Sequence, residues 1–116
     1  MTTRLPKHLF DALGAARLAT EFVRGVDDVA YADNVMVRSA VERQLEVLGE
    51  SCRRSLDEEP ALRERIPEMA LAIALRNRII HGYDRLEHAI VLDSVRRDLP
   101  GLIGALAREL ERFPLP

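Results

Sequence analysis

The most apolar stretch of the chain ends in a dense polar cluster. Seven consecutive apolar residues, Met69 to Leu75, are followed within ten positions by Arg76, Asn77, Arg78, His81, Tyr83, Asp84 and Arg85. Histidine both takes and gives a proton near neutral pH. Arginine supplies a fixed positive charge to a transition state centred on phosphorus. These residue types therefore suit the cleavage of a phosphodiester without a metal ion.

Arg76 and His81 together supply the simplest chemistry of this kind. His81 would remove the proton of a ribose 2′-hydroxyl, which then attacks the adjacent phosphate, while Arg76 stabilises the developing negative charge. Asn77 would hydrogen-bond the phosphate or orient the imidazole. The cluster holds too few carboxylates and histidines for a metal site, so we expect neither a metal nor a cofactor.

The same residues also fit a purely structural role. A histidine near a helix C-terminus commonly interacts with the helix dipole and the terminal carbonyl groups, and Arg76 and Arg78 could do the same. Spacing alone leaves the catalytic and the structural interpretations open.

The spacing of Arg76 and His81 raises a geometric problem. They lie five positions apart, which at about 100° per residue turns their side chains well apart around a helix. Either the helix unwinds at Gly82, or a second copy of the segment meets the first across a two-fold axis. Charged residues in the last turns of an apolar helix also need a cleft or a subunit interface, because burying a charge is costly. We therefore expect a homodimer.

Helical periodicity predicts the elements that precede this cluster. A first helix follows Pro6, with apolar residues at three- and four-residue steps until Gly25 and the pair Asp27-Asp28 interrupt the pattern. A longer apolar stripe, flanked by charged residues, predicts a second helix from about Asp33 to Leu56. Cys52 lies on this stripe, so we expect it in the core.

The cluster itself lies on a predicted third helix. Pro67 and Glu68 have the character of a helix start, and we expect the helix to end near Gly82 in the left-handed conformation that glycine favours. Because this sequence is apolar on all sides, we expect it to be the buried central helix. A last helical segment covers residues 86–113, and Pro100-Gly101 should kink or divide it.

Length and composition set the fold class. The chain has 116 residues, of which 47% are hydrophobic, 31% charged and 4% aromatic. These values predict one globular domain, residues 1–116, with a core of aliphatic side chains. With the helical patterns above, the predicted fold is an all-α, up-and-down helical bundle of four to five helices.

Charge and cysteine content limit the partners and the compartment. A net charge of −2 and a pI of about 5.9 give no support to a large nucleic-acid-binding surface, so any RNA contact must come from a local basic patch. Sixteen of the seventeen basic residues are arginine, for which a coding bias is the simplest explanation. A single cysteine, no signal-peptide pattern and no apolar run near ~20 residues predict a cytoplasmic protein without a membrane segment.

Two phrases of the sequence resemble the HEPN superfamily, specifically its HepT-like branch. That branch carries a motif in which Arg is followed by four residues, His, one residue and Tyr. This chain is similar to it almost letter for letter in Arg76-Asn77-Arg78-Ile79-Ile80-His81-Gly82-Tyr83. The segment from Val41 to Glu50 is similar to its second-helix phrase, and Asp98-Leu99-Pro100 follows in the last helix. Relatives often have a tryptophan after the proline before the third helix, where this chain has Glu68-Met69, and an aromatic residue at Val91-Leu92. Those departures concern packing and leave the motif intact.

The resemblance implies a function and a set of roles. It implies the toxin of a type II toxin–antitoxin pair, a metal-independent endoribonuclease when dimeric, with Arg76 and His81 as catalytic residues. Asn77 and Arg78 would be supporting RNA contacts. The implied antitoxin is a minimal nucleotidyltransferase that transfers AMP from ATP to Tyr83 and so inhibits the toxin.

One alternative belongs to a different functional class. The chain could be a non-catalytic helical subunit that binds a nucleotidyltransferase partner, and the motif alone does not exclude this. A neighbouring gene for a small nucleotidyltransferase would support pairing without proving cleavage.

Overall fold

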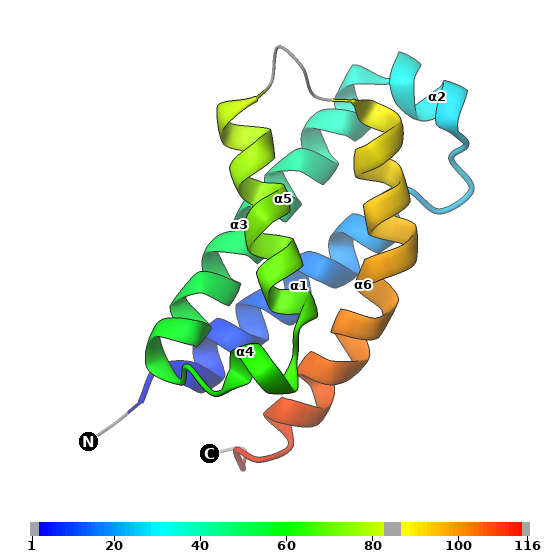
Figure 1. The fold of residues 1–116 in the computed structure, drawn as a ribbon. Helices are drawn as coiled ribbons and strands as arrows, with labels where there is room; N and C mark the ends of the chain where they lie inside the picture. Colours follow the sequence, from blue (N-terminus) through cyan, green and yellow to red (C-terminus); the bar gives the residue numbers. More distant parts are fainter. Residues whose placement is uncertain (1–2, 83–86, 115–116) are drawn as a thin grey trace.

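The computed structural model describes residues 3–82 and 87–114. Within these ranges all regular structure is helical: α1 (Leu5–Phe22), α2 (Asp28–Asp33), α3 (Val35–Glu58), α4 (Leu62–Arg65), α5 (Glu68–His81) and α6 (His88–Leu110). The long helices α1, α3, α5 and α6 run alternately up and down, so the start of α1 and the end of α6 lie at the same end of the molecule (Figure 1). This confirms the predicted all-α bundle.

The first two helices follow from local sequence signals. Pro6 lies in the first turn of α1, where its missing N–H is not needed. The chain turns after α1 at Gly25, whose φ of 72° is a conformation that glycine adopts readily. The short helix α2 was not predicted. It begins where the side chain of Asp27 accepts a hydrogen bond from the Ala30 N–H, and it buries the ring of Tyr31.

Helix α3 is the centre of the bundle. Its first N–H groups are capped by Asn34, whose side chain accepts from the Val37 N–H at 3.0 Å. It starts and ends two residues later than the predicted Asp33–Leu56. It packs most extensively against α1 and next against α5. The central position therefore belongs to the helix with the ordered apolar stripe.

The prediction that α5 is the buried central helix is wrong. Only Met69, Ala72 and Ile79 of α5 are fully buried, and Leu71 is 55% exposed. The reason is that α5 lies at the side of the bundle. It packs mainly against α3 and makes only a small contact with α6. Among the described helices none is long and apolar enough to cross a membrane.

The expectation about the end of α5 is also wrong, and of the two expectations for Pro100 the division of the helix is excluded. Gly82 follows α5 with a φ of −130°, so the helix does not close through a left-handed residue there. Pro100 does not divide the last helical segment, because α6 continues through it. Leu99 and Leu102 are buried on either side of the exposed Pro100, and their packing holds the helix together across the missing hydrogen bond.

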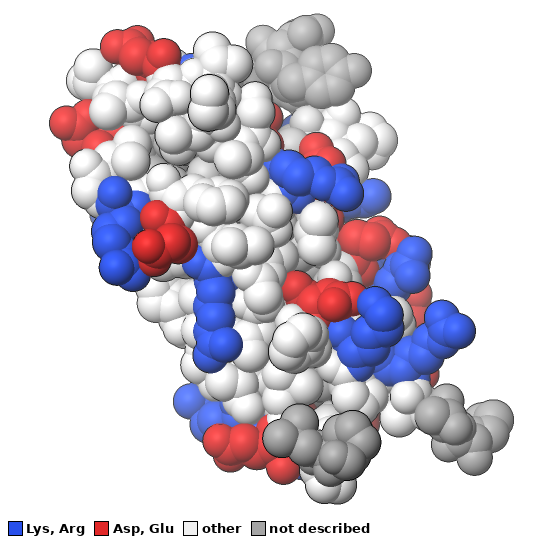
Figure 2. Space-filling model, turned by 180° about the vertical axis from the view of Figure 1, so that it is seen from behind, with Lys and Arg blue, Asp and Glu red and all other residues white. Residues whose placement is uncertain are grey.

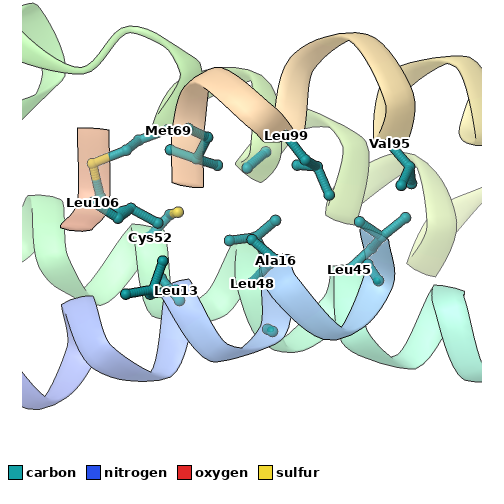
Figure 3. Close-up of a cluster of buried hydrophobic side chains, with 14 of the residues drawn as sticks. Leu13, Ala16, Leu45, Leu48, Cys52, Met69, Val95, Leu99 and Leu106 are labelled. Atoms are coloured by element: carbon teal, nitrogen blue, oxygen red, sulfur yellow. The ribbon is translucent and has the colours of Figure 1, made fainter. Parts of the chain in front are cut away.

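The core is aliphatic, as the composition predicted. Side chains from α1, α3, α5 and α6 meet in one cluster, in which the labelled residues are Leu13, Ala16, Leu45, Leu48, Cys52, Met69, Val95, Leu99 and Leu106 (Figure 3). Burying one leucine side chain stabilises the fold by about 1.5–3 kcal/mol. Cys52 is fully buried in this cluster, which confirms its predicted place in the core.

Candidate active site

The last two turns of α5 carry most of the polar motif. Arg76 is half-buried, whereas Asn77, Arg78 and His81 are exposed, with His81 as the final residue of the helix. Tyr83, the predicted AMP acceptor, lies outside the residues that the structure describes. The structure therefore sets Arg76 apart from its neighbours, because its side chain is held against the body of the protein.

Arg76 packs where α5 and α3 approach most closely. A Cβ placed on Gly49 of α3 would overlap the Cβ of Arg76 and would lie 2.7 Å from its Cγ. The same atom would lie 3.1 Å from the carbonyl oxygen of Ala72. Only glycine leaves room for the Arg76 side chain at this crossing, so the stem of Arg76 lies directly on the backbone of α3.

The guanidinium of Arg76 makes one hydrogen bond and one longer ion pair. Its Nη1 donates to Oδ1 of Asn77 at 3.0 Å, and its Nη2 lies 3.7 Å from Oε2 of Glu50. Its Nε is buried and has no hydrogen-bond partner within the described part of the chain. In this structure the side chain of Asn77 therefore contacts Arg76, and its predicted contact with phosphate or imidazole stays a prediction.

The carboxylate of Glu50 interacts with the guanidinium groups of three arginines. It accepts hydrogen bonds from Nη2 of Arg53 at 2.7 Å and from Nε of Arg54 at 3.0 Å, in addition to its ion pair with Arg76. The hydrogen bonds from Arg53 and Arg54 lower the pKa of Glu50 to about 2. Glu50 is therefore ionised at neutral pH and presents a permanent negative charge to Arg76.

Sequence reasoning missed Gly49 and Glu50 as members of the site. Both lie in the phrase Leu48-Gly49-Glu50, which was noted only as part of the family resemblance. Glycine followed by glutamate within an otherwise regular helix was the available signal, since glycine in a helix interior is unfavourable unless close packing requires it.

A groove opens beside Arg76. It has a volume of about 370 Å³, with α3 as its floor and with α1 and α5 as its walls. Basic side chains line it from all three helices: Arg4, Lys7, Arg43, Arg54 and Arg76, with the imidazole of His8 among them. In Figure 2, basic side chains gather with carboxylates on the edge of the molecule beside the N-terminal residues.

Arg76 and His81 are not brought together by the fold of one chain. Helix α5 continues without interruption through both residues, so it does not unwind to unite them. Five positions of a regular helix separate their directions by about 140°. Arg76 faces α3, and His81 stands at the exposed end of α5. No group of three or more metal-binding side chains occurs among the described residues.

The helical bundle, with this arginine–histidine motif at the end of α5, matches the family model described as Ribonuclease HepT-like over residues 12–109. The chain belongs to this HepT-like ribonuclease family. The match covers α3 and α5 completely, α6 up to residue 109 and α1 from residue 12 onward, and it includes Arg76, Asn77, Arg78, His81 and Tyr83.

Two curated relatives carry names that propose a ribonuclease. A protein of Methanocaldococcus jannaschii, named as a proposed RNase, is 32% identical over 94 residues, which cover 79% of this chain and 84% of the relative. A protein of Thermococcus cleftensis, named as a proposed ribonuclease HepT, is 28% identical over 97 residues, which cover 84% of this chain and 87% of the relative. Among solved structures there is no significant match.

Proposed function

We propose that this protein is the toxin of a type II toxin–antitoxin pair and acts as a metal-independent endoribonuclease, with Arg76 and His81 as its catalytic residues. The observation that carries the proposal is the placement of Arg76. Its stem is packed on Gly49, its guanidinium is held by Glu50 and Asn77, and its side chain lines a basic groove. Membership of the HepT-like ribonuclease family supports it.

The chemistry follows from the two side chains. The neutral imidazole of His81 takes the proton of a ribose 2′-hydroxyl, and the 2′-oxygen attacks the adjacent phosphorus. The bond from phosphorus to the 5′-oxygen breaks, and that oxygen takes up a proton. The products are a 2′,3′-cyclic phosphate and a 5′-hydroxyl. Arg76 stabilises the additional negative charge on the phosphoryl oxygens, and Arg78 contacts a neighbouring phosphate.

A homodimer completes this site in the proposal. His81 and Arg76 of one chain point in different directions, so the histidine of one copy acts beside the arginine of the other. The exposed side of α5 offers a surface for such pairing. Leu71 is 55% exposed there. A large apolar side chain exposed on the helix that carries the motif favours this side as the interface.

The proposed regulator is a minimal nucleotidyltransferase antitoxin that transfers AMP from ATP to Tyr83. Tyr83 directly follows Gly82, the residue that ends α5. AMP attached there adds a negative phosphate next to the turn of Arg78 and His81. That phosphate pairs with arginines that otherwise hold RNA, and the adenosine occupies the path of the strand.

Cleavage assays with matched variants test the catalytic part. Arg76→Ala and His81→Ala should each abolish RNA cleavage, while Arg97→Ala, which removes an exposed arginine of α6, should leave it unchanged. Cleavage should persist in EDTA and leave cyclic phosphate ends. Loss of activity on chelation, restored by a divalent metal, overturns the mechanism. A wild-type chain that binds a nucleotidyltransferase yet cleaves no RNA favours the non-catalytic subunit instead.

Intact-mass measurement tests the regulatory part. After incubation with the cognate nucleotidyltransferase and ATP, the wild-type chain should gain at least one AMP and lose ribonuclease activity. Tyr83→Phe should gain none and remain active. Equal modification of Tyr83→Phe, or full activity of the modified wild type, contradicts this role of Tyr83.

A further inference from the structure

We infer that the groove beside Arg76 is the track for the RNA backbone on one side of the scissile phosphate. The inference rests on the proposed function, because it takes Arg76 as the contact of the reacting phosphate. The contacts that it adds are Arg4 just before α1, Lys7 of α1, and Arg43 and Arg54 of α3, none of which belongs to the arginine–histidine motif.

The charge of the groove contrasts with that of the whole chain. Five fixed cations line it, against the three carboxylates of Asp11, Glu46 and Glu50. The complete chain has a net charge of −2. Positive charge is therefore concentrated in the groove beside Arg76. A protein with a negative net charge needs such a local basic patch to bind RNA.

The groove is elongated, as a path for a strand must be. Arg43, Val47, Glu50 and Arg54 lie along one side of α3 at helical steps, and eleven residues of helix span about 16 Å. Stacked nucleotides rise by only about 3.4 Å each, so this length accommodates several phosphates. Beyond Arg54 lies a second hollow, lined by Arg4, His8 and Arg54 together with the carboxylates of Asp57 and Glu58, so the excess of positive charge ends at Arg54.

The groove cations are available to an incoming phosphate. Lys7 pairs with Asp11 at 2.7 Å and Arg43 pairs with Glu46 at 3.5 Å, both within one helix. Lys7 and Arg43 themselves are about 70% exposed, and such surface pairs contribute at most about 1 kcal/mol. Either cation can therefore turn toward RNA at small cost.

The chemistry at the end of the groove favours RNA over an acidic protein segment. In the proposed function, the phosphate bound at Arg76 is the group that reacts. The RNA strand that continues from this phosphate then lies in the groove that Arg76, Arg43 and Arg54 line. His8 also lines this groove, but its side chain is only 8% exposed, so the arginines and Lys7 supply the contacts. A polyanionic peptide needs no connection to Arg76.

The test compares two double variants that remove equal charge. Lys7→Gln with Arg43→Gln removes groove cations, one from an i,i+4 pair and one from an i,i+3 pair. Arg97→Gln with Arg24→Gln removes cations outside the groove, again one from an i,i+4 pair and one from an i,i+3 pair. Binding is measured by fluorescence anisotropy with single-stranded RNA that is 2′-O-methylated throughout and therefore cannot be cleaved.

The groove variant should bind this RNA about 10-fold more weakly than the wild type. The slope of log affinity against log salt should fall by roughly 1.4, since each lost phosphate contact of a single strand removes about 0.7. The Arg97/Arg24 variant should bind within about 2-fold of wild type. Circular dichroism of both variants should match the wild type, because all four cations are on the surface.

Equal affinities of the two double variants overturn the inference even if the wild-type chain cleaves RNA. Loss of RNA binding only in the groove variant supports the inference, even if the wild-type chain cleaves no RNA. In that case the proposed function is wrong, but the assignment of the groove to RNA stands. Polyglutamate of matched charge is the competitor. If it binds the groove and the methylated RNA does not, an acidic protein segment is the occupant and the inference is wrong.

Discussion

Gly49 of α3 and Arg76 of α5 pack backbone against side chain, with no space for a methyl group between them. The residue after Gly49 is Glu50, which holds the guanidinium of the same arginine. Two adjacent residues of α3 therefore fix both the stem and the charged end of Arg76. A catalytic arginine needs this kind of support, because a phosphate transition state is stabilised by charge that is already in position.

Substitution of Gly49 by alanine should damage the fold and the site together. The added methyl group must displace the stem of Arg76 or the turn of Ala72, and overpacking of this kind costs about 1–3 kcal/mol. Thermal unfolding and RNA cleavage should both be impaired. Gly14→Ala is the matched control. Gly14 also lies inside a helix but has open space around it, so alanine there should stabilise by about 0.5–1 kcal/mol. Equal effects of the two substitutions would show that Gly49 has no special role.

Substitution of Glu50 by glutamine should weaken the interaction that positions the guanidinium of Arg76. Glutamine keeps the shape but removes the charge that attracts the guanidinium groups of Arg53, Arg54 and Arg76. We expect a loss of about 1 kcal/mol in the free energy of unfolding at pH 7, because exposed ion pairs contribute about 0.2–1 kcal/mol each. RNA cleavage should fall by more than stability does. Asp93→Asn, which breaks one exposed pair with Arg97, should cost only a few tenths of a kcal/mol.

The difference between wild type and Glu50→Gln should depend on pH. Folding lowers the pKa of Glu50 from 4.5 to about 2. The folded state therefore favours the ionised form, and its contribution to stability is complete above about pH 4.5. It is lost as the pH falls toward about 2, where the folded protein also binds the proton. Urea unfolding at several pH values measures this. A difference that stays constant down to pH 2 would mean that the charge of Glu50 does not stabilise the fold.

The exposed side of α5 should govern association. Leu71→Asp places a charge on the proposed interface, so sedimentation should show a monomer at concentrations where the wild type is a dimer. Leu18→Asp is the control, since Leu18 is 45% exposed on α1, away from α5. A wild-type chain that is monomeric at micromolar concentration contradicts the dimer itself. Dissociation by Leu18→Asp but not by Leu71→Asp would move the interface to α1.

Cys52 should be chemically inert in the folded protein. Burial among aliphatic side chains raises the pKa of its thiol to about 12, so almost no thiolate exists at neutral pH. A disulfide reagent should react on the order of 100-fold more slowly with the folded chain than with the chain in guanidinium chloride. Rapid modification without denaturant would mean that the core opens far more often than its packing indicates.

Periodicity was enough to place the long helices but not to rank their burial. The stripe that contains Leu45, Leu48 and Cys52 predicted α3 to within two residues at each end. The uniformly apolar α5 was wrongly made the central helix, because hydrophobicity on all sides does not say which helix lies between the others. Arg76 and His81 were singled out as candidate site residues from their types and spacing. Gly49 and Glu50 were not, since their contact with Arg76 joins residues more than twenty-five positions apart.

Pairing through the exposed side of α5, where Leu71 lies, would have a consequence for the concentration at which the protein acts. If two copies form each complete site, then below the dissociation constant of the dimer the number of sites grows with the square of the chain concentration. Halving the amount of free chain would reduce activity about fourfold in that range. Such a protein would be nearly silent at low abundance and would act steeply once its synthesis exceeds a threshold, so that pairing itself works as a switch.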